Sequence, residues 1–221
     1  GDLMQRLTNK GIHHWRELEN VLPNHEVLPL TVSFRQSVKM LNLARQLYKN
    51  SVGHDPDYTA KKDFASVPDP LAYINKDEYE KLNWIEKRIR EIYDIYDSLP
   101  STAIFLNDHE QEFKFSQDLG ARKFFKETGI KVVVGNEGEN LAKENLVLVF
   151  SIDKVKGMEF DAVFFHNIDE TPYTGDLIKR FIYVGVSRAA FFLGITMSEK
   201  NKENEELLKY FDTKANWRYF E

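Results

Sequence analysis

The chain has 221 residues, 42% of them hydrophobic and 29% charged, with a formal net charge of −5. This composition is that of an ordinary globular protein, and its charge argues against nonspecific wrapping of nucleic acid, although not against a small local contact. The absence of cysteine excludes disulfides and thiolate metal sites and fits a cytoplasmic protein. No apolar run approaches the roughly 20 residues of a membrane span, so no membrane partner is expected.

The first third of the chain is predicted to contain one strand and one helix. No metal site is predicted, because the adjacent His13 and His14 would point apart on a helix. Residues 26–33 indicate a strand, and Ser37 is a candidate N-cap for the helix that follows. The apolar residues of this helix recur at helical spacing and are Val38, Leu41, Ala44 and Leu47. Residues 51–70 are rich in proline and charge and are predicted to be a loop.

The clearest helix is predicted over residues 76–99, where an apolar stripe recurs at helical spacing with charges between. Pro100 stops this helix. The stripe consists of Tyr79, Leu82, Ile85, Ile89, Ile92 and Tyr96. The other elements predicted in this part are strands over 71–74, 101–106 and 130–134 and a helical stretch over 107–128 that breaks near Gly120.

The last third centres on two apolar runs, residues 146–152 and 162–165, that flank a short charged loop. Continuous apolar runs are typical of parallel strands that are buried on both faces. The elements predicted to follow are a helix over 174–186, a strand over 191–197, a polar helix over 198–211 and a docked aromatic tail with Trp217, Tyr219 and Phe220. The alternation of strands and helices predicts an α/β fold with a doubly wound, mainly parallel sheet and helices on both faces.

Four short motifs follow one another in a fixed order. They are Gly1-Asp2-x-x-Gln5, Ser33-Phe34-Arg35-Gln36-Ser37, Ser151-x-Asp153-x-x-Lys156-Gly157-Met158-Glu159-Phe160-Asp161 and Tyr183-Val184-Gly185-Val186-Ser187-Arg188-Ala189. Together they resemble motifs III, IV, V and VI of the superfamily 1 DNA helicases of the UvrD/Rep/PcrA type. The resemblance implies that residues 26–221 are the second RecA-like domain (2A, of the P-loop NTPase type) and residues 1–25 a linker or the tail of a preceding motor domain. Because the first motif begins at Gly1, we interpret the chain as a piece of a longer protein.

What the resemblance implies for function is one half of an ATP site, closed by a missing N-terminal RecA-like domain that would also hold Mg²⁺. The implied nucleotide-binding residues are Gln5 at the γ-phosphate, Phe34 on the adenine, and Glu159 on the ribose together with its neighbour Gly157. The implied catalytic residues are Arg35 and Arg188, which would reach the γ-phosphate. Arginine suits this role because it stays charged and presents a planar fork to phosphate oxygens. An arginine supplied by the second domain makes hydrolysis depend on domain closure.

The resemblance departs from the family pattern at the expected contact with single-stranded DNA. Asp153 stands where the family has a histidine, and an aspartate there would repel phosphate. Ser151 and Lys156 are the other candidates for this contact. Only a short segment separates the strand at 130–134 from the third motif, which indicates that the 2B subdomain is absent. This layout is closest to helicase IV and to RNA-polymerase-associated helicase-like factors.

Three functions remain open at this stage. The chain is expected to be the C-terminal motor domain of an ATP-dependent DNA helicase or translocase, and alternatively the motor half of an ATP-driven factor that acts on RNA polymerase. A degenerate module used only for protein binding would be expected to lose the phosphate arginines, yet Arg35 and Arg188 are both present. The chain contains neither a phosphate loop nor a Walker B pair, so it is expected to be inactive alone.

Overall fold

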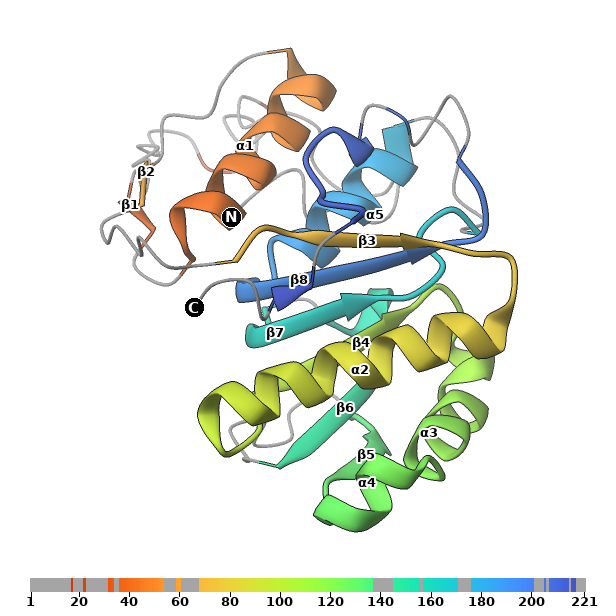
Figure 1. Cartoon of the computed structure of the whole chain (residues 1–221). Helices are drawn as coiled ribbons and strands as arrows, with labels where there is room; N and C mark the ends of the chain where they lie inside the picture. Colours follow the sequence, from red (N-terminus) through yellow and green to blue (C-terminus); the bar gives the residue numbers. More distant parts are fainter. Residues whose placement is uncertain are drawn as a thin grey trace.

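A computed structural model describes residues 17, 22, 32–33, 36–53, 59–60, 68–136, 145–155, 157–170, 176–200, 205, 207–214 and 216–217. Its centre is a six-stranded sheet with the order β3-β8-β7-β4-β6-β5 (Figure 1). The strands are β3 (Leu71–Ile74), β4 (Thr102–Leu106), β5 (Lys131–Val134), β6 (Leu146–Ser151), β7 (Phe160–Phe165) and β8 (Ala189–Met197). Every neighbouring pair in this sheet is parallel. The predicted α/β fold with a parallel sheet is therefore confirmed.

Helices cover both faces of the sheet. On one face lie α1 (Val38–Val52) and α5 (Asp176–Val186), and on the other lie α2 (Glu78–Tyr96), α3 (Glu112–Gly120) and α4 (Lys123–Thr128) (Figure 1). Successive strand side chains point to opposite faces, so Ala103 and Phe105 join one apolar cluster while Ile104 and Leu106 join the other. None of the described helices combines the length and the apolar composition that a membrane span requires.

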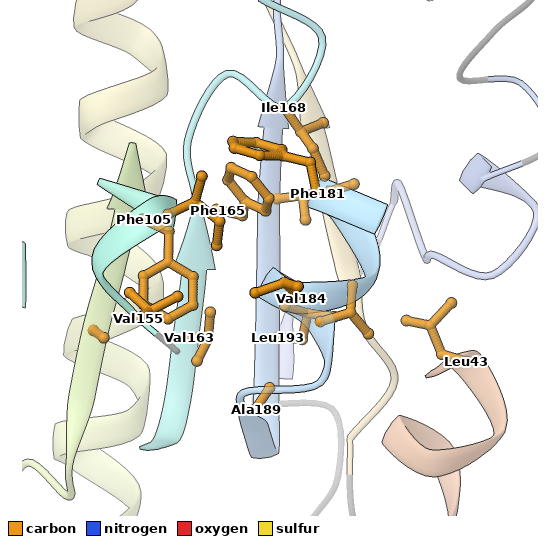
Figure 2. Packing of buried hydrophobic residues seen from close by; sticks show 14 of the residues in the cluster. Leu43, Phe105, Val155, Val163, Phe165, Ile168, Phe181, Val184, Ala189 and Leu193 are labelled. Atoms are coloured by element: carbon orange, nitrogen blue, oxygen red, sulfur yellow. The ribbon is translucent and has the colours of Figure 1, made fainter. Parts of the chain in front are cut away.

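The cluster beneath α5 shows how the sheet buries its apolar side chains. Phe105, Phe165 and Phe181 pack edge to face or tilted, with ring centroids 5.1 Å apart for Phe165 and Phe181 (Figure 2). Val184 and Leu193 extend the same contact surface. Because each central strand is buried on both faces, its sequence is mostly apolar rather than alternating. This is why the two apolar runs of the last third were recognisable as strands.

The first helix begins where its sequence predicts. The Ser37 side chain accepts a hydrogen bond from the Met40 N–H at 3.3 Å, as expected for an N-cap. Gly53 ends α1 in the left-handed conformation, with φ of 83°. The preceding strand is described only at β1 (Val32–Ser33), which pairs in parallel with β2 (Thr59–Ala60). The second of these strands interrupts the segment that we predicted to be a loop.

The apolar stripe of α2 is confirmed at its centre and wrong at its two ends. Leu82, Ile85, Ile89 and Ile92 are buried, whereas Tyr79 is 62% and Tyr96 54% exposed. These two tyrosines lie in the first and last turns of α2, and helical spacing alone does not show how much of a helix its sheet covers. The helix ends at Asp97, which adopts a left-handed φ of 55° before Pro100 is reached.

The C-terminal segment differs from the polar helix predicted for it. Residues 198–200 are not helical, whereas residues 205, 207 and 208 are helical as predicted; residues 209–210 then form a turn and residue 211 a bend. Asp212 then bridges to β3, since its N–H donates to Pro70 O at 2.8 Å and its carbonyl accepts from Ala72 N–H at 2.9 Å. Trp217 is buried against Phe164 and Phe192, as expected for a docked aromatic. Tyr219 and Phe220 lie outside the described residues.

Candidate functional site

The third and fourth motifs, which we call motifs V and VI, meet at the amino-terminal edge of the sheet. Glu159 immediately precedes β7, and Arg188 immediately precedes β8. These strands are parallel neighbours with Phe160 paired to Ala189, and the Phe160 N–H donates to Arg188 O at 3.0 Å. The two motifs therefore lie side by side although they are separated in the sequence.

The guanidinium of Arg188 ties the motif V loop to the end of α5. Its Nη1 donates to Met158 O at 3.1 Å and its Nε to Val184 O at 3.3 Å, while Nη2 donates to Ser187 Oγ at 3.1 Å. Arg188 is only 4% exposed in this arrangement. Glu159, the residue after Met158, is exposed. Because its side chain is buried, Arg188 would have to become more accessible before it could contact a phosphate.

The end of the second motif, which we call motif IV, lies against the same edge. The Gln36 side-chain amide donates to the carbonyls of Ser187 and Ala189, each at 3.2 Å. The Ser37 N–H donates to Ala190 O at 2.9 Å. The predicted residues Phe34 and Arg35 directly precede Gln36 but lie outside the described residues, as do Gln5, Lys156 and almost all of residues 1–25.

Gly157 is required by the backbone conformation of the motif V loop. Its φ of 81° lies in the left-handed region, which residues with a side chain rarely adopt. Nothing lies within 4 Å of where its Cβ would be, so the requirement comes from backbone strain rather than crowding. The turn places Met158 where its carbonyl reaches Arg188.

Ser151 and Asp153, predicted to contact DNA, lie at the other end of the motif V loop. Ser151 ends β6, and Asp153 is exposed in the short 3₁₀ helix η4 (Ile152–Lys154) that follows. Because β6 and β7 run in the same direction, the loop leaves from the carboxyl-terminal edge of the sheet and returns to the amino-terminal edge. The residues predicted to contact the nucleotide, Glu159 and Arg188, and those predicted to contact DNA therefore lie at opposite edges of the sheet.

Residues 146–195 match the UvrD-like helicase C-terminal domain. The match contains both motif V and motif VI, together with β6, β7, α5 and most of β8. The fold is also similar to the crystal structure of the C-terminal domain of a possible DNA helicase from Lactobacillus plantarum WCFS1. The TM-score is 0.53 at 17% sequence identity, and the alignment covers 75% of this chain and 88% of the other. None of the curated proteins is detectably similar in sequence to the chain.

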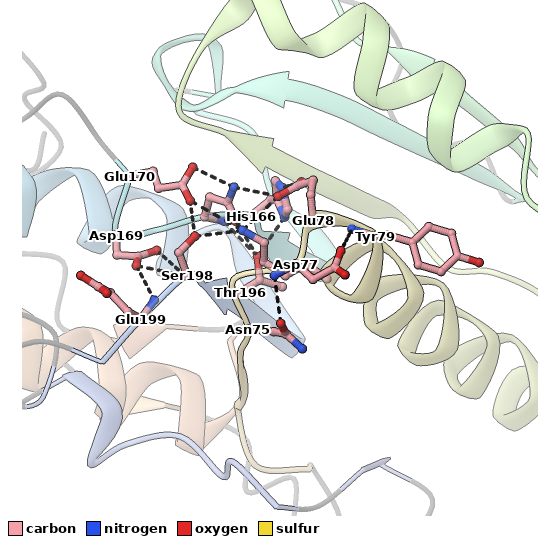
Figure 3. Close-up of polar contacts among 12 residues, drawn as sticks. Asn75, Asp77, Glu78, Tyr79, His166, Asp169, Glu170, Thr196, Ser198 and Glu199 are labelled. Carbon is pink, nitrogen blue, oxygen red and sulfur yellow. Dashed lines mark hydrogen bonds and ion pairs between the residues drawn. The ribbon is translucent and has the colours of Figure 1, made fainter.

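A second polar cluster, at the carboxyl-terminal edge, is one that reading the sequence did not reveal (Figure 3). Lys81 of α2 is 1% exposed, and its Nζ donates to Asn167 Oδ1 at 2.6 Å and Ser198 Oγ at 3.0 Å. It also forms ion pairs with Glu78 at 2.9 Å and Glu170 at 3.6 Å. These contacts fasten the first turn of α2 to the ends of β7 and β8. The only indication of this cluster in the sequence is that polar residues directly follow both strands.

The same cluster holds a hydroxyl, imidazole and carboxylate in a row, but it is not built for nucleophilic catalysis. His166 lies between Thr196 Oγ1, at 2.9 Å from Nδ1, and the carboxylate of Glu78 on Nε2. Thr196 is buried, and its hydroxyl also accepts from the Asn167 N–H at 3.0 Å. A nucleophile must be reachable by its substrate, so we interpret the cluster as structural.

Glu78 is expected to make the stability of the domain depend on acid pH. Partial burial alone would raise the pKa of this carboxyl, but the hydrogen bonds and charges of His166 and Lys81 outweigh it and lower the pKa from 4.5 to about 2. A carboxyl whose pKa is lowered on folding contributes stability above its unfolded pKa and loses that contribution as pH falls toward its folded pKa. Guanidinium unfolding of the parent and of Glu78→Gln between pH 2.5 and 7 should therefore show a stability difference that shrinks below about pH 4.5. A difference that stays constant over this range would contradict the assignment.

Proposed function

We propose that the chain is the C-terminal motor domain, 2A, of an ATP-dependent DNA helicase or translocase, and that it supplies half of an interdomain ATP site. One observation supports this proposal above all. The end of motif IV, the motif V loop and motif VI converge on one edge of the sheet, through the bonds of Gln36 to Ser187 and Ala189 and of Arg188 to Met158. Motifs V and VI precede neighbouring parallel strands, and motif IV joins them there although Gln36 lies 151 residues before Ser187 in the sequence.

In this proposal Arg188 and Arg35 act as the catalytic arginines, and Phe34, Gly157, Glu159 and Gln5 contact the nucleotide. A preceding RecA-like domain would hold the phosphates and Mg²⁺. Charge-assisted bonds from arginine to phosphate are roughly twice as strong as bonds between neutral groups. A γ-phosphate brought to this edge by domain closure would therefore compete well with the Met158 carbonyl for the Arg188 guanidinium. Release of that carbonyl would in turn free the motif V loop to move.

A second candidate is the motor half of an ATP-driven factor associated with RNA polymerase. Asp153 favours it, because this exposed carboxylate would oppose a phosphate at the edge where single-stranded DNA is expected. Single-stranded DNA that stimulates ATP hydrolysis by the whole protein would support the helicase or translocase. Co-purification with RNA polymerase, together with no such stimulation, would support the polymerase factor.

The proposal of a half-site predicts that hydrolysis needs both domains. We expect the 221-residue chain alone to show no ATP hydrolysis above background, because it lacks the phosphate loop. The whole protein should hydrolyse ATP, and deletion of these residues should abolish the activity. Phosphate release assays on the three purified proteins provide the measurement. Hydrolysis by the 221-residue chain, or undiminished hydrolysis after its deletion, would refute the proposal.

A further inference from the structure

The motif V loop begins with Ser151 and η4, which we call the motif V turn. This turn is held at the carboxyl-terminal edge of the sheet by a residue outside all four motifs. Glu112 is the first residue of α3, and its side chain is only 5% exposed. Its Oε1 accepts from the Ser151 N–H at 2.6 Å, and its two carboxylate oxygens accept from Lys154 Nζ at 2.9 and 2.8 Å. One carboxylate thus holds both the backbone that enters η4 and the cation at its end.

This contact also decides which charges the turn presents to solvent. Lys154 is the basic residue of η4, and its ammonium group forms an ion pair with the Glu112 carboxylate. Asp153 is exposed beside it, and Glu110 is exposed in the turn that precedes α3. A lysine paired with a buried carboxylate offers little attraction to a phosphate, because the pair is neutral as a whole.

Two buried polar atoms at this edge can still form hydrogen bonds, although Lys154 is already paired with Glu112. Ser151 Oγ and Asn107 Oδ1 are buried and have no hydrogen-bond partner within the described part of the chain. Asn107 follows β4 and Ser151 is the last residue of the neighbouring strand β6, where it is paired with Leu106. Buried polar atoms usually have partners, and open α/β sheets bind ligands at the carboxyl ends of their strands. The edge therefore has features of a binding site, and Glu112 neutralises the lysine beside it.

We propose that Glu112 is a positioning residue that holds the motif V turn and masks Lys154 from the phosphates of a single nucleic-acid strand. This inference rests on the proposed function, because the strand as ligand follows from the helicase interpretation. Its consequence is that the acidic side chain weakens binding at this edge. Removing the Glu112 charge should strengthen binding, whereas a residue needed only for folding would give a loss.

The test measures binding of a fluorescein-labelled 20-nucleotide oligo-dT to the whole protein, without ATP, over a range of salt concentrations. Glu112→Gln keeps an oxygen that can accept from the Ser151 N–H but removes the charge that pairs with Lys154. We expect affinity at low salt to rise about two- to fivefold, and log K against log salt to steepen by about 0.7, the value for one added phosphate contact. The matched control is Glu127→Gln, which removes an equal charge from an exposed pair with Lys123 on α4. It should change neither quantity.

Lys154→Met added to Glu112→Gln provides a second reading. If the gain in Glu112→Gln comes from the unmasked Lys154, the double variant should bind oligo-dT with the affinity and salt slope of the parent, because both charges of the neutral pair are then removed. Unchanged or weaker binding in Glu112→Gln, or a gain that persists in the double variant, would overturn the inference. Since these measurements use no ATP, such a result in a protein that still hydrolyses ATP would leave the half-site standing.

Discussion

Arg188→Ala in the whole protein is expected to lower the rate of ATP hydrolysis by about 10³–10⁵-fold, the range for an arginine placed on a transferring phosphoryl group. The site supports this expectation because Arg188 precedes β8 directly and touches the motif V loop at Met158. Its guanidinium bonds to backbone carbonyls, which are weaker partners than a phosphate. The measurement is steady-state phosphate release at saturating ATP, with nucleotide binding measured separately.

The burial of Arg188 calls for controls on folding, because its removal also leaves two carbonyls without these bonds. Arg188→Lys keeps the charge but cannot present a fork, so it should lose most of the rate while disturbing the fold less. Arg90→Ala removes an exposed arginine of α2 that pairs with Glu86 at 3.5 Å, and it should hydrolyse ATP like the parent. Hydrolysis by Arg188→Ala within tenfold of the parent, in a protein with an unchanged melting temperature, would rule out the catalytic role.

The elements that sequence predicted best are those whose structure depends on local chemistry. Ser37 caps α1 because a serine oxygen can reach the N–H of a residue in the first turn. The predicted break near Gly120 is observed as the junction of α3 and α4. The strands β6 and β7 were recognisable because burial on both faces demands an uninterrupted apolar run.

The convergence of the motifs could not be derived in the same way, because it depends on tertiary geometry. Arg35 follows a predicted strand, whereas Glu159 and Arg188 precede theirs, so strand direction alone does not bring them to one edge. The observed contacts run through Gln36 and the first turn of α1, which meet the start of β8. Nothing in the sequence states how α1 is placed against that strand.

Lys81 shows a second limit of prediction from sequence, because a lysine close to glutamates on a helix is expected on the solvent-exposed face. Its burial follows from how the first turn of α2 crosses the ends of β7 and β8, and helical periodicity does not contain that information. In the same turn, Tyr79 was predicted to be part of the buried stripe and is exposed instead. The sequence shows polar residues at the ends of β7 and β8, but it does not show that Lys81 of α2 is their partner.

Lys81→Met is expected to destabilise the domain by about 3 kcal/mol, the lower end of the range for removing one partner of a buried ion pair. The lower end applies because Glu78 and Glu170 are about half exposed and water can replace part of the lost interaction. For a chain of this size the loss corresponds to a fall in melting temperature of about 6–12 °C. The effect arises because Asn167 Oδ1 and Ser198 Oγ lose a donor together with the two carboxylates.

The control for this prediction is Lys114→Met, which removes an exposed lysine that pairs with Asp118 at 2.6 Å. It should change stability by less than about 1 kcal/mol, as is usual for a surface ion pair. Combining Lys81→Met with Glu78→Gln should cost less than the sum of the single changes, since each variant already breaks their shared contact. A Lys81→Met protein that melts within 1 °C of the parent, or strictly additive costs, would show that the network does not hold α2 against the sheet. In that case the position of Glu78 and His166 would have to be explained by the apolar packing of α2 alone.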